Sequence, residues 1–223
     1  MMEFLMSKHM TLCFGLFFAG FGLVYACSRM RYEWSARSVS APNVLEGPQR
    51  HLVRPEMLIA TAKMTDVVAP AFRAQATDDS YYDIAELTGD GPVVLVFIKE
   101  GCPCSLAAQP FFNLLFDAYG KHARFFGVFD GSVSKAKKWA MQNQAAFPLL
   151  SDPDLRTVHE YKAENSAYVA LIAKGGTIKK LWPGYSVEML ADAAARLARL
   201  TGVIAKPIDV SAAPTEITTG CPY

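Results

Sequence analysis

The sequence predicts an α/β domain built around a central mixed sheet. Residues 93–98, Val-Val-Leu-Val-Phe-Ile, form a continuous apolar run rich in β-branched and aromatic side chains, which is typical of a strand buried on both faces. Predicted strands and helices alternate along the rest of the chain. Lys174-Gly175-Gly176-Thr177 separates two short apolar runs near the end and indicates a hairpin.

Each element follows from the same patterns. Residues 82–87 are predicted as one or two helical turns before the turn at 89–92. The helix after the central strand, Leu106 to Tyr119, has apolar residues at helical spacing, at positions 111, 114, 115 and 118. The remaining prediction comprises a strand at 124–129, a helix ending near 143, a helix at 154–161, strands at 169–172 and 178–182, and a helix beginning at Ser186.

A membrane segment is predicted ahead of this domain. Residues 10–27 contain no charged side chain, and their length is at the short end of the roughly 17–25 residues that span a bilayer. The segment is a signal sequence, a signal anchor or a lipoprotein signal. Val24-Tyr25-Ala26-Cys27-Ser28 resembles a lipobox, which makes Cys27 the candidate lipidation site. Lipidation at Cys27 and an uncleaved anchor both remain open.

Composition sets the domain boundaries. We predict residues 1–27 as the signal or anchor and residues 28–64, which contain three prolines, as a linker with a short ordered piece at 57–62. Residues 65–202 form the folded domain, and residues 203–223 form a flexible C-terminal tail.

Charge and cysteine content exclude several classes of protein. The chain has 22 Lys and Arg against 21 Asp and Glu, a net charge of +1, which gives no indication of nucleic-acid binding. Its five cysteines are too few and too irregularly placed for a disulfide scaffold. The chain lacks the paired Cys-x-x-Cys motifs that would indicate structural zinc. We therefore predict neither a bound metal nor a cofactor.

Cys102 is the main candidate for a reactive residue. It follows Gly101 where the predicted central strand ends and the next helix begins. Free amides and the helix dipole favour an anion there, and such a position lowers a cysteine pKa from about 8.5 to roughly 3.5–7.5. The alternative is a buried cysteine that only fills space. The neighbouring glycine, which offers no covering side chain, favours a reactive thiolate.

Two further cysteines are candidate partners of Cys102. Cys104 lies two residues on, so a disulfide between the two requires a non-helical turn; the alternative is an inert Cys104 packed inward. Cys221 lies two residues from the last residue. A tail of roughly twenty residues, spanning about 5–6 Å times the square root of its length, could bring it to Cys102 as a resolving cysteine. The alternative is an unreactive thiol on a frayed end.

Several motifs occur together with this cysteine. The strand ending in Cys102-Pro103, with Pro110 in the next helix, is accompanied by Ala-Pro-Ala-Phe at 69–72 and Phe-Pro-Leu-Leu-Ser-Asp at 147–152. With the strand and glycines at 168–176, these motifs resemble the redoxin group, the alkyl hydroperoxide reductase and thiol-specific antioxidant (AhpC/TSA) superfamily, over residues 66–202. The resemblance implies a thioredoxin-like three-layer α/β/α sandwich and thiol-based redox chemistry.

The chain departs from the peroxiredoxin pattern around the cysteine. Lys99 and Leu95 stand where those enzymes have a hydroxyl residue and a proline, and Ser166-Ala167-Tyr168 stands where an arginine is expected. Donors that polarise peroxide oxygens are therefore missing. Ser166-Ala167 also lacks the cis-proline of the reductase relatives, and Val96 stands where thioredoxins have a buried acid.

We therefore predict a membrane-tethered thiol–disulfide oxidoreductase or peroxiredoxin-like antioxidant protein that acts through a Cys102 thiolate. Its partner is a thiol or disulfide protein or a peroxide, and we place its redox domain on the extracytoplasmic side of the membrane. Arg29, Arg31 and Arg37 after the span favour the cytoplasmic side instead, unless the segment is cleaved at Cys27. One alternative is a copper(I) or other metal carrier that uses Cys102, Cys104 and His159. Another is a redoxin scaffold that has lost activity.

Overall fold

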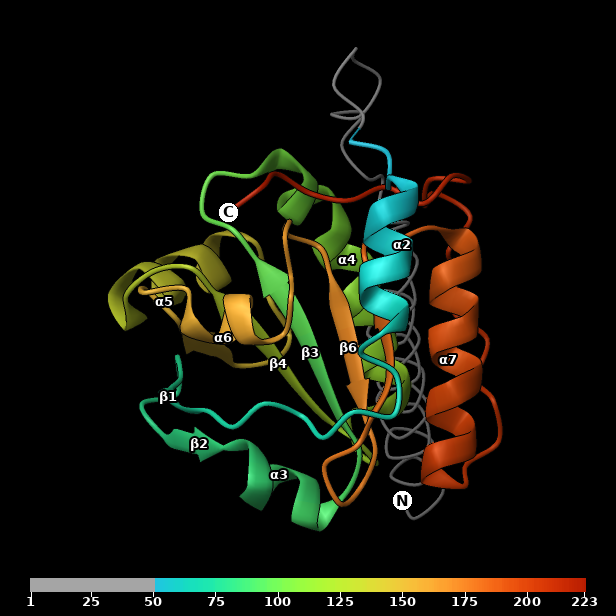
Figure 1. Cartoon of the computed structure of the whole chain (residues 1–223), viewed down its shortest axis with the longest axis horizontal. Coiled ribbons are helices and arrows are strands. Elements are labelled where there is room, and N and C mark those ends of the chain that lie inside the picture. Colours follow the sequence, from blue (N-terminus) through green and yellow to red (C-terminus); the bar gives the residue numbers. More distant parts are fainter. Residues whose placement is uncertain (1–50) are drawn as a thin grey trace, which may run out of the picture. The chain divides into compact units, whose positions relative to one another are not determined.

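The computed structural model describes residues 51–223 (Figure 1). The predicted membrane segment at 10–27, the lipidation candidate Cys27 and most of the predicted linker lie outside these residues. Within residues 51–223, no helix combines the length and the apolar character needed to cross a membrane.

A five-stranded sheet with the order β5-β4-β3-β6-β7 forms the centre of the domain. The central strand β3 (Val93–Ile98) pairs in parallel with β4 (Arg124–Phe129) and antiparallel with β6 (Val169–Ile172). On the outside, β5 (Leu149–Ser151) is parallel to β4, and β7 (Ile178–Trp182) is antiparallel to β6. The predicted mixed sheet is confirmed.

The side chains of β3 supply a separate core on each face of the sheet. None of its six residues is more than 2% exposed. Because successive strand side chains point to opposite faces, positions 94, 96 and 98 join one core and positions 93, 95 and 97 join the other. The first core is covered by α4 (Pro103–Tyr119) and α7 (Val187–Thr201), and the second by α3 (Ile84–Asp90) and α6 (Arg156–Glu160).

The structure differs from the prediction of a helix at residues 82–87. Tyr82, predicted as helical, lies in the short hairpin formed by β1 (Arg73–Gln75) and β2 (Tyr81–Asp83). The helix after it begins only at Ile84, because the Asp83 side chain accepts a hydrogen bond from the Ala85 amide at 2.8 Å and caps it.

Two helices complete the domain. The helix α2 (Pro55–Ala62) lies in the stretch predicted as linker and begins with a proline at its first position. The helix α5 (Val133–Gln142) follows β4 and ends one residue before the predicted boundary. Both are short elements at the surface of the α/β core.

The last seven residues, Ile217 to Tyr223, are fixed by backbone hydrogen bonds, although residues 203–223 were predicted as a flexible tail. We call residues 217–223 the C-terminal strap. Thr218 exchanges two backbone hydrogen bonds of 2.9 Å with Tyr185, and the Thr219 amide donates to the His51 carbonyl at 2.7 Å. In Figure 1 the strap crosses the end of the sheet where β3 passes to α4, and the C-terminus lies beside that loop. The strap contains no helix and is therefore ordered by hydrogen bonds to residues that are distant from it in the sequence.

Truncation of Leu95 to alanine tests the central strand. Leu95 is 0% exposed, so we expect Leu95→Ala to lower the free energy of unfolding by about 2–5 kcal/mol through lost burial and a cavity. Leu58→Ala on α2 is the matched control, because Leu58 is 48% exposed and its truncation should cost much less. Urea denaturation of the two variants measures the difference, and equal losses would contradict the described core.

Candidate active site

The turn between β3 and α4 places Cys102 at the N-cap of the helix. Gly101 has a φ of 71°, a left-handed conformation that glycine adopts without a steric cost, and it turns the chain out of the strand. Pro103 takes the first helical position, where its missing N–H leaves no hydrogen bond unmade. The Ser105 hydroxyl accepts a hydrogen bond from the Lys99 amide at 3.2 Å and closes the turn. Ser105, which occupies the second thiol position of dithiol motifs, is thus used structurally here.

The Cys102 sulfur lies beneath the C-terminal strap and is surrounded by donors. The residue is 1% exposed. The Cys221 amide and the Ser166 hydroxyl each donate to Cys102 Sγ at 3.2 Å, and Cys221 Sγ lies 2.9 Å from it. The Cys102 side chain makes no capping hydrogen bond to α4. Cys102 thus lies at the expected start of the helix, but its sulfur makes no capping hydrogen bond to α4; the two hydrogen bonds of 3.2 Å come from the strap and from the segment before β6.

These contacts shift the pKa values of Cys102, Cys104 and Cys221 in different directions. The Cys104 thiol, followed by the Cys221 thiol and amide and the Ser166 hydroxyl, holds the pKa of Cys102 well below its usual range, against the opposing effect of burial. The interaction with Cys102, together with burial, raises the pKa of Cys104. Burial first, and then the hydrogen bond to Cys102 and the charge of Cys102, raises the pKa of Cys221. At neutral pH Cys102 carries the charge and its two neighbours remain thiols.

His51 approaches the second cysteine of the motif, a contact that sequence reasoning missed. Its Nδ1 lies 3.9 Å from the sulfur of Cys104, which is buried in the first turn of α4. Because His51 falls in a stretch predicted as linker, no pattern in the sequence marks it. Its position depends on the backbone hydrogen bond from Thr219 in the strap.

The metal-carrier alternative has no ligand set in the part of the chain that is described. His159 is exposed on α6. Across residues 51–223, no three His, Cys, Asp or Glu side chains are grouped so that they could hold a metal ion.

Ser166 holds the strap over Cys102 through both of its backbone groups. Its carbonyl accepts from the Gly220 amide at 2.8 Å, and its own amide donates to the Cys221 carbonyl at 3.0 Å. The neighbouring Asn165 side chain donates to the Gly220 carbonyl at 2.7 Å, and the Tyr223 amide donates to the backbone carbonyl of Glu164 at 3.2 Å. The strap therefore runs as an extended chain along residues 164–166, with Cys221 directly over the buried cysteine.

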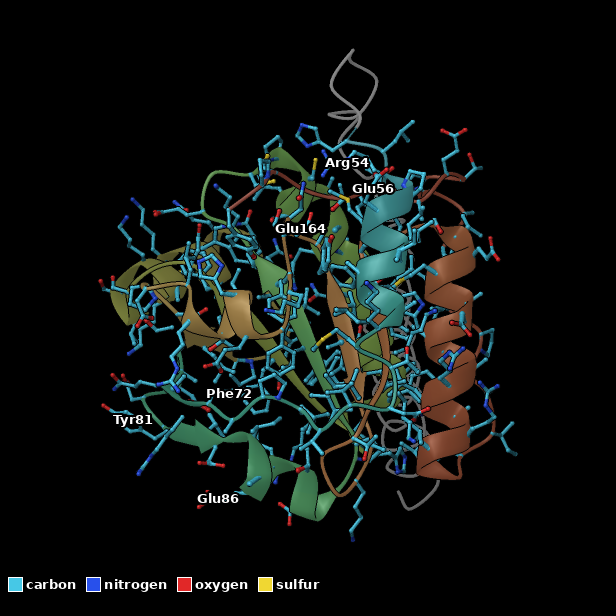
Figure 2. The ribbon with its side chains drawn as sticks, viewed as in Figure 1. Arg54, Glu56, Phe72, Tyr81, Glu86 and Glu164 are labelled. Atoms are coloured by element: carbon cyan, nitrogen blue, oxygen red, sulfur yellow. The ribbon has the colours of Figure 1, made fainter. Side chains whose placement is uncertain are left out.

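Charged residues at this end of the sheet secure the surrounding segments. Lys99 Nζ donates to the Pro222 carbonyl at 2.5 Å and lies 5.8 Å from the centre of the Tyr223 ring. Figure 2 labels Arg54 and Glu164 near the same end, and their side chains form an exposed ion pair of 3.8 Å. Exposed pairs of this kind contribute little to stability, so the backbone contacts of the strap are the more important.

The neighbouring Glu100 is committed to other partners. Its carboxylate pairs with Lys135 Nζ at 2.7 Å, and its amide donates to Asp130 Oδ1 at 2.7 Å. Burial is the main cause that raises the pKa of Asp130. These contacts fix the loop that carries Cys102 to the end of β4.

The arrangement is suited to thiol chemistry. A low-pKa cysteine is the nucleophile in thiol–disulfide exchange, and a second thiol at 2.9 Å has only about 1 Å to travel to reach the roughly 2.05 Å of a disulfide. A mixed sheet with such a cysteine at the start of the helix after its central strand defines a protein of the thioredoxin-like class.

Comparison with known proteins gives the family. The model of the AhpC/TSA family matches residues 66–182, more than half of the chain, and the chain belongs to that family. No curated protein sequence matches the chain at a significant level.

Solved structures share the fold at low sequence identity. A candidate protein disulfide isomerase from Bacteroides thetaiotaomicron is 22% identical, with a TM-score of 0.56 over 62% of this chain and 90% of that one. The thioredoxin domain of a thiol-disulfide oxidoreductase from Bacteroides vulgatus is 17% identical, with a TM-score of 0.52 over 59% and 96%. Peroxidoxin BcpB from Mycobacterium tuberculosis is 21% identical, with a TM-score of 0.52 over 63% and 98%. These likenesses confirm the thioredoxin-like fold.

Removal of one donor should be visible in the titration of Cys102. A hydrogen bond to a charged group is worth about 1.5–3 kcal/mol, so Ser166→Ala should raise the Cys102 pKa by about 1–2 units. The thiolate ultraviolet absorbance of the reduced protein, followed from acidic to neutral pH, reports this pKa as its first step. Ser132→Ala, at an exposed serine before α5, is the control and should leave the step in place. An unmoved step in Ser166→Ala would show that the hydroxyl does not stabilise the thiolate.

Proposed function

We propose that this protein is a thiol–disulfide oxidoreductase in which Cys102 is the nucleophile and Cys221 the resolving cysteine. The separation of 2.9 Å between the two sulfurs is the observation that supports it best. Membership of the AhpC/TSA family and the lowered pKa of Cys102 agree with this chemistry.

The reaction has two exchange steps. The Cys102 thiolate attacks one sulfur of a substrate disulfide; a mixed disulfide forms, the substrate S–S bond breaks, and the released thiolate takes a proton. Cys221, after losing its proton, then attacks Cys102 Sγ and releases the second substrate thiol. The substrate gains two electrons, the Cys102–Cys221 pair becomes a disulfide, and an external dithiol reduces it for the next cycle.

Cys104 and Ser166 support the nucleophile in this scheme. The raised pKa of Cys104 keeps its proton in place, so it acts as a donor to the Cys102 charge and not as a second nucleophile. Ser166, whose hydroxyl lies 3.2 Å from the sulfur, supplies a second donor. Each loses part of its interaction when Cys102 enters a disulfide and its charge disappears.

Peroxide reduction is the second candidate, favoured by the Ser166 hydroxyl. A hydroxyl 3.2 Å from Cys102 Sγ provides one donor for a peroxide oxygen at a site without the hydroxyl and arginine of peroxiredoxins. Attack on the peroxide would form an S–O bond and release an alcohol or water. Cys221 would then displace water from the sulfenic acid and form the same disulfide.

Three cysteine variants test the assignment of roles. Cys102→Ser should abolish reduction of a small-molecule disulfide by the full chain in the presence of a dithiol. Cys221→Ser should retain the first step, stop at a mixed disulfide on Cys102 and lose most turnover. Cys104→Ser should keep the two-step cycle with a higher Cys102 pKa.

Turnover rates and mass spectrometry of trapped adducts provide the measurements. Repeating the assay with hydrogen peroxide in place of the disulfide separates the two candidate activities. Full activity of Cys102→Ser with either oxidant would eliminate the proposal.

We extend the proposal to membrane attachment through residues 10–27, with Cys27 as the lipidated residue and the redox domain on the extracytoplasmic side. An uncharged run of this length that ends in Ala26-Cys27 supports it. Cys27→Ser should abolish incorporation of labelled fatty acid while leaving the folded domain intact. Cys13→Ser, in the same apolar run, is the control and should retain the label. Persistent labelling of Cys27→Ser would instead exclude Cys27 as the acceptor.

A further inference from the structure

The C-terminal strap shows how an extended chain carrying a cysteine binds at this site. The backbone of Ser166 accepts from Gly220 and donates to the carbonyl of Cys221, and Asn165 adds a bond of 2.7 Å to the carbonyl of Gly220. These contacts use main-chain atoms of the bound segment, so another chain with the same backbone shape can make them. They place the cysteine of that segment against Cys102 Sγ.

The residue before that cysteine is subject to a strict steric limit. A Cβ added to Gly220 would overlap the Ser166 hydroxyl and would lie 2.7 Å from the Ser166 carbonyl oxygen and 2.8 Å from its carbonyl carbon. The hydroxyl can rotate, but the carbonyl belongs to the backbone just ahead of β6, which is buried. Only glycine fits at this place without moving the main chain.

From these contacts we propose that residues 164–166 are a docking edge for a partner protein whose reactive cysteine lies in an extended segment directly after a glycine. The strap, with Gly220-Cys221, is its resident occupant, and the partner's Gly-Cys segment, in a disulfide, takes the same place. This inference rests on the proposed function, since it names the disulfide substrate of Cys102.

The strap and the partner segment compete for the docking edge, and this competition sets the order of the two exchange steps. The strap leaves, the partner segment pairs with Ser166, and the Cys102 thiolate attacks the partner disulfide with release of one partner thiolate. When the strap returns it displaces the partner segment and brings Cys221 to Cys102 Sγ. The Cys102–partner bond breaks as the Cys102–Cys221 bond forms, and an external dithiol reduces the product.

The experiment uses two synthetic peptides that reproduce the strap sequence, Ile-Thr-Thr-Gly-Cys-Pro-Tyr, and its twin with alanine in place of glycine. The cysteine of each is a mixed disulfide with the chromophore thionitrobenzoate, so attack by Cys102 releases colour. The protein is the full chain with Cys221→Ser, alone or with Gly184→Ala. A Cβ at Gly184 would overlap the Thr218 carbonyl oxygen and lie 2.7 Å from its carbon, which dislodges the strap without altering Ser166.

We expect Gly184→Ala to accelerate the reaction of the Gly-Cys peptide by about tenfold, because the edge is vacated. In that variant the Ala-Cys peptide should react about tenfold more slowly than the Gly-Cys peptide, because of the steric overlap at Ser166. Gly89→Ala in the Cys221→Ser chain is the control, since a Cβ there meets nothing within 4 Å. Peptide mass mapping confirms that the adduct is on Cys102.

Two other outcomes would contradict the docking edge alone or the docking edge together with the proposed function. Equal rates for the two peptides, with normal reaction of Cys102 towards dipyridyl disulfide, would overturn the docking edge and leave the proposed function standing. Failure of Cys102 to react with either peptide or with dipyridyl disulfide would overturn both. If Gly184→Ala does not fold, Gly220→Ala dislodges the strap at Ser166 itself and the same rate comparison applies.

Discussion

The pairing of Ser166 with Gly220 and Cys221 is the interaction on which the site depends. It brings a donor amide, a donor hydroxyl and a second thiol to one sulfur, across segments more than fifty residues apart. Without it, Cys102 would keep its place at the start of α4 but would lose two of these contacts and most of its cover. The thiolate is thus stabilised by the Cys104 thiol in the first turn of α4 and by donors from distant segments, whereas the Cys102 side chain makes no capping hydrogen bond to the helix.

The sheet makes that pairing possible because it fixes both sides of the site. The buried strand β3 ends at the loop that carries Cys102, and its neighbour β6 begins just after Ser166. Hydrogen bonds of the Ala167 amide to Phe97 and of the Phe97 amide to Tyr168 join the two strands at this end. The distance between nucleophile and hydroxyl therefore follows from the register of two central strands, which are among the most deeply buried parts of the domain.

Local sequence patterns predicted most of this framework. The apolar run of β3, the hairpin glycines at 175 and 176 and the Ser186 cap of α7 each act through near neighbours, and all three are found. The strap was beyond reach of such patterns, because its order comes from Tyr185, Ser166 and His51, which are remote in sequence. Cys221 is nonetheless predicted as a candidate, from its residue type and from the reach of the tail that carries it. Ser166 enters the sequence analysis only as the place where a proline or an arginine is missing, and His51 does not enter it.

The strap pairs with residues from the other end of the described domain, and this sets a sequence of events during synthesis. Thr219 bonds to His51, and these two residues delimit nearly the whole described chain. A ribosome releases chain from the N-terminal side first, so Cys102 is made long before the residues that cover it. A newly made chain therefore presents an open nucleophilic sulfur until residues 217–223 emerge, and in that interval the sulfur is accessible to oxidants and to other thiols that the strap keeps away.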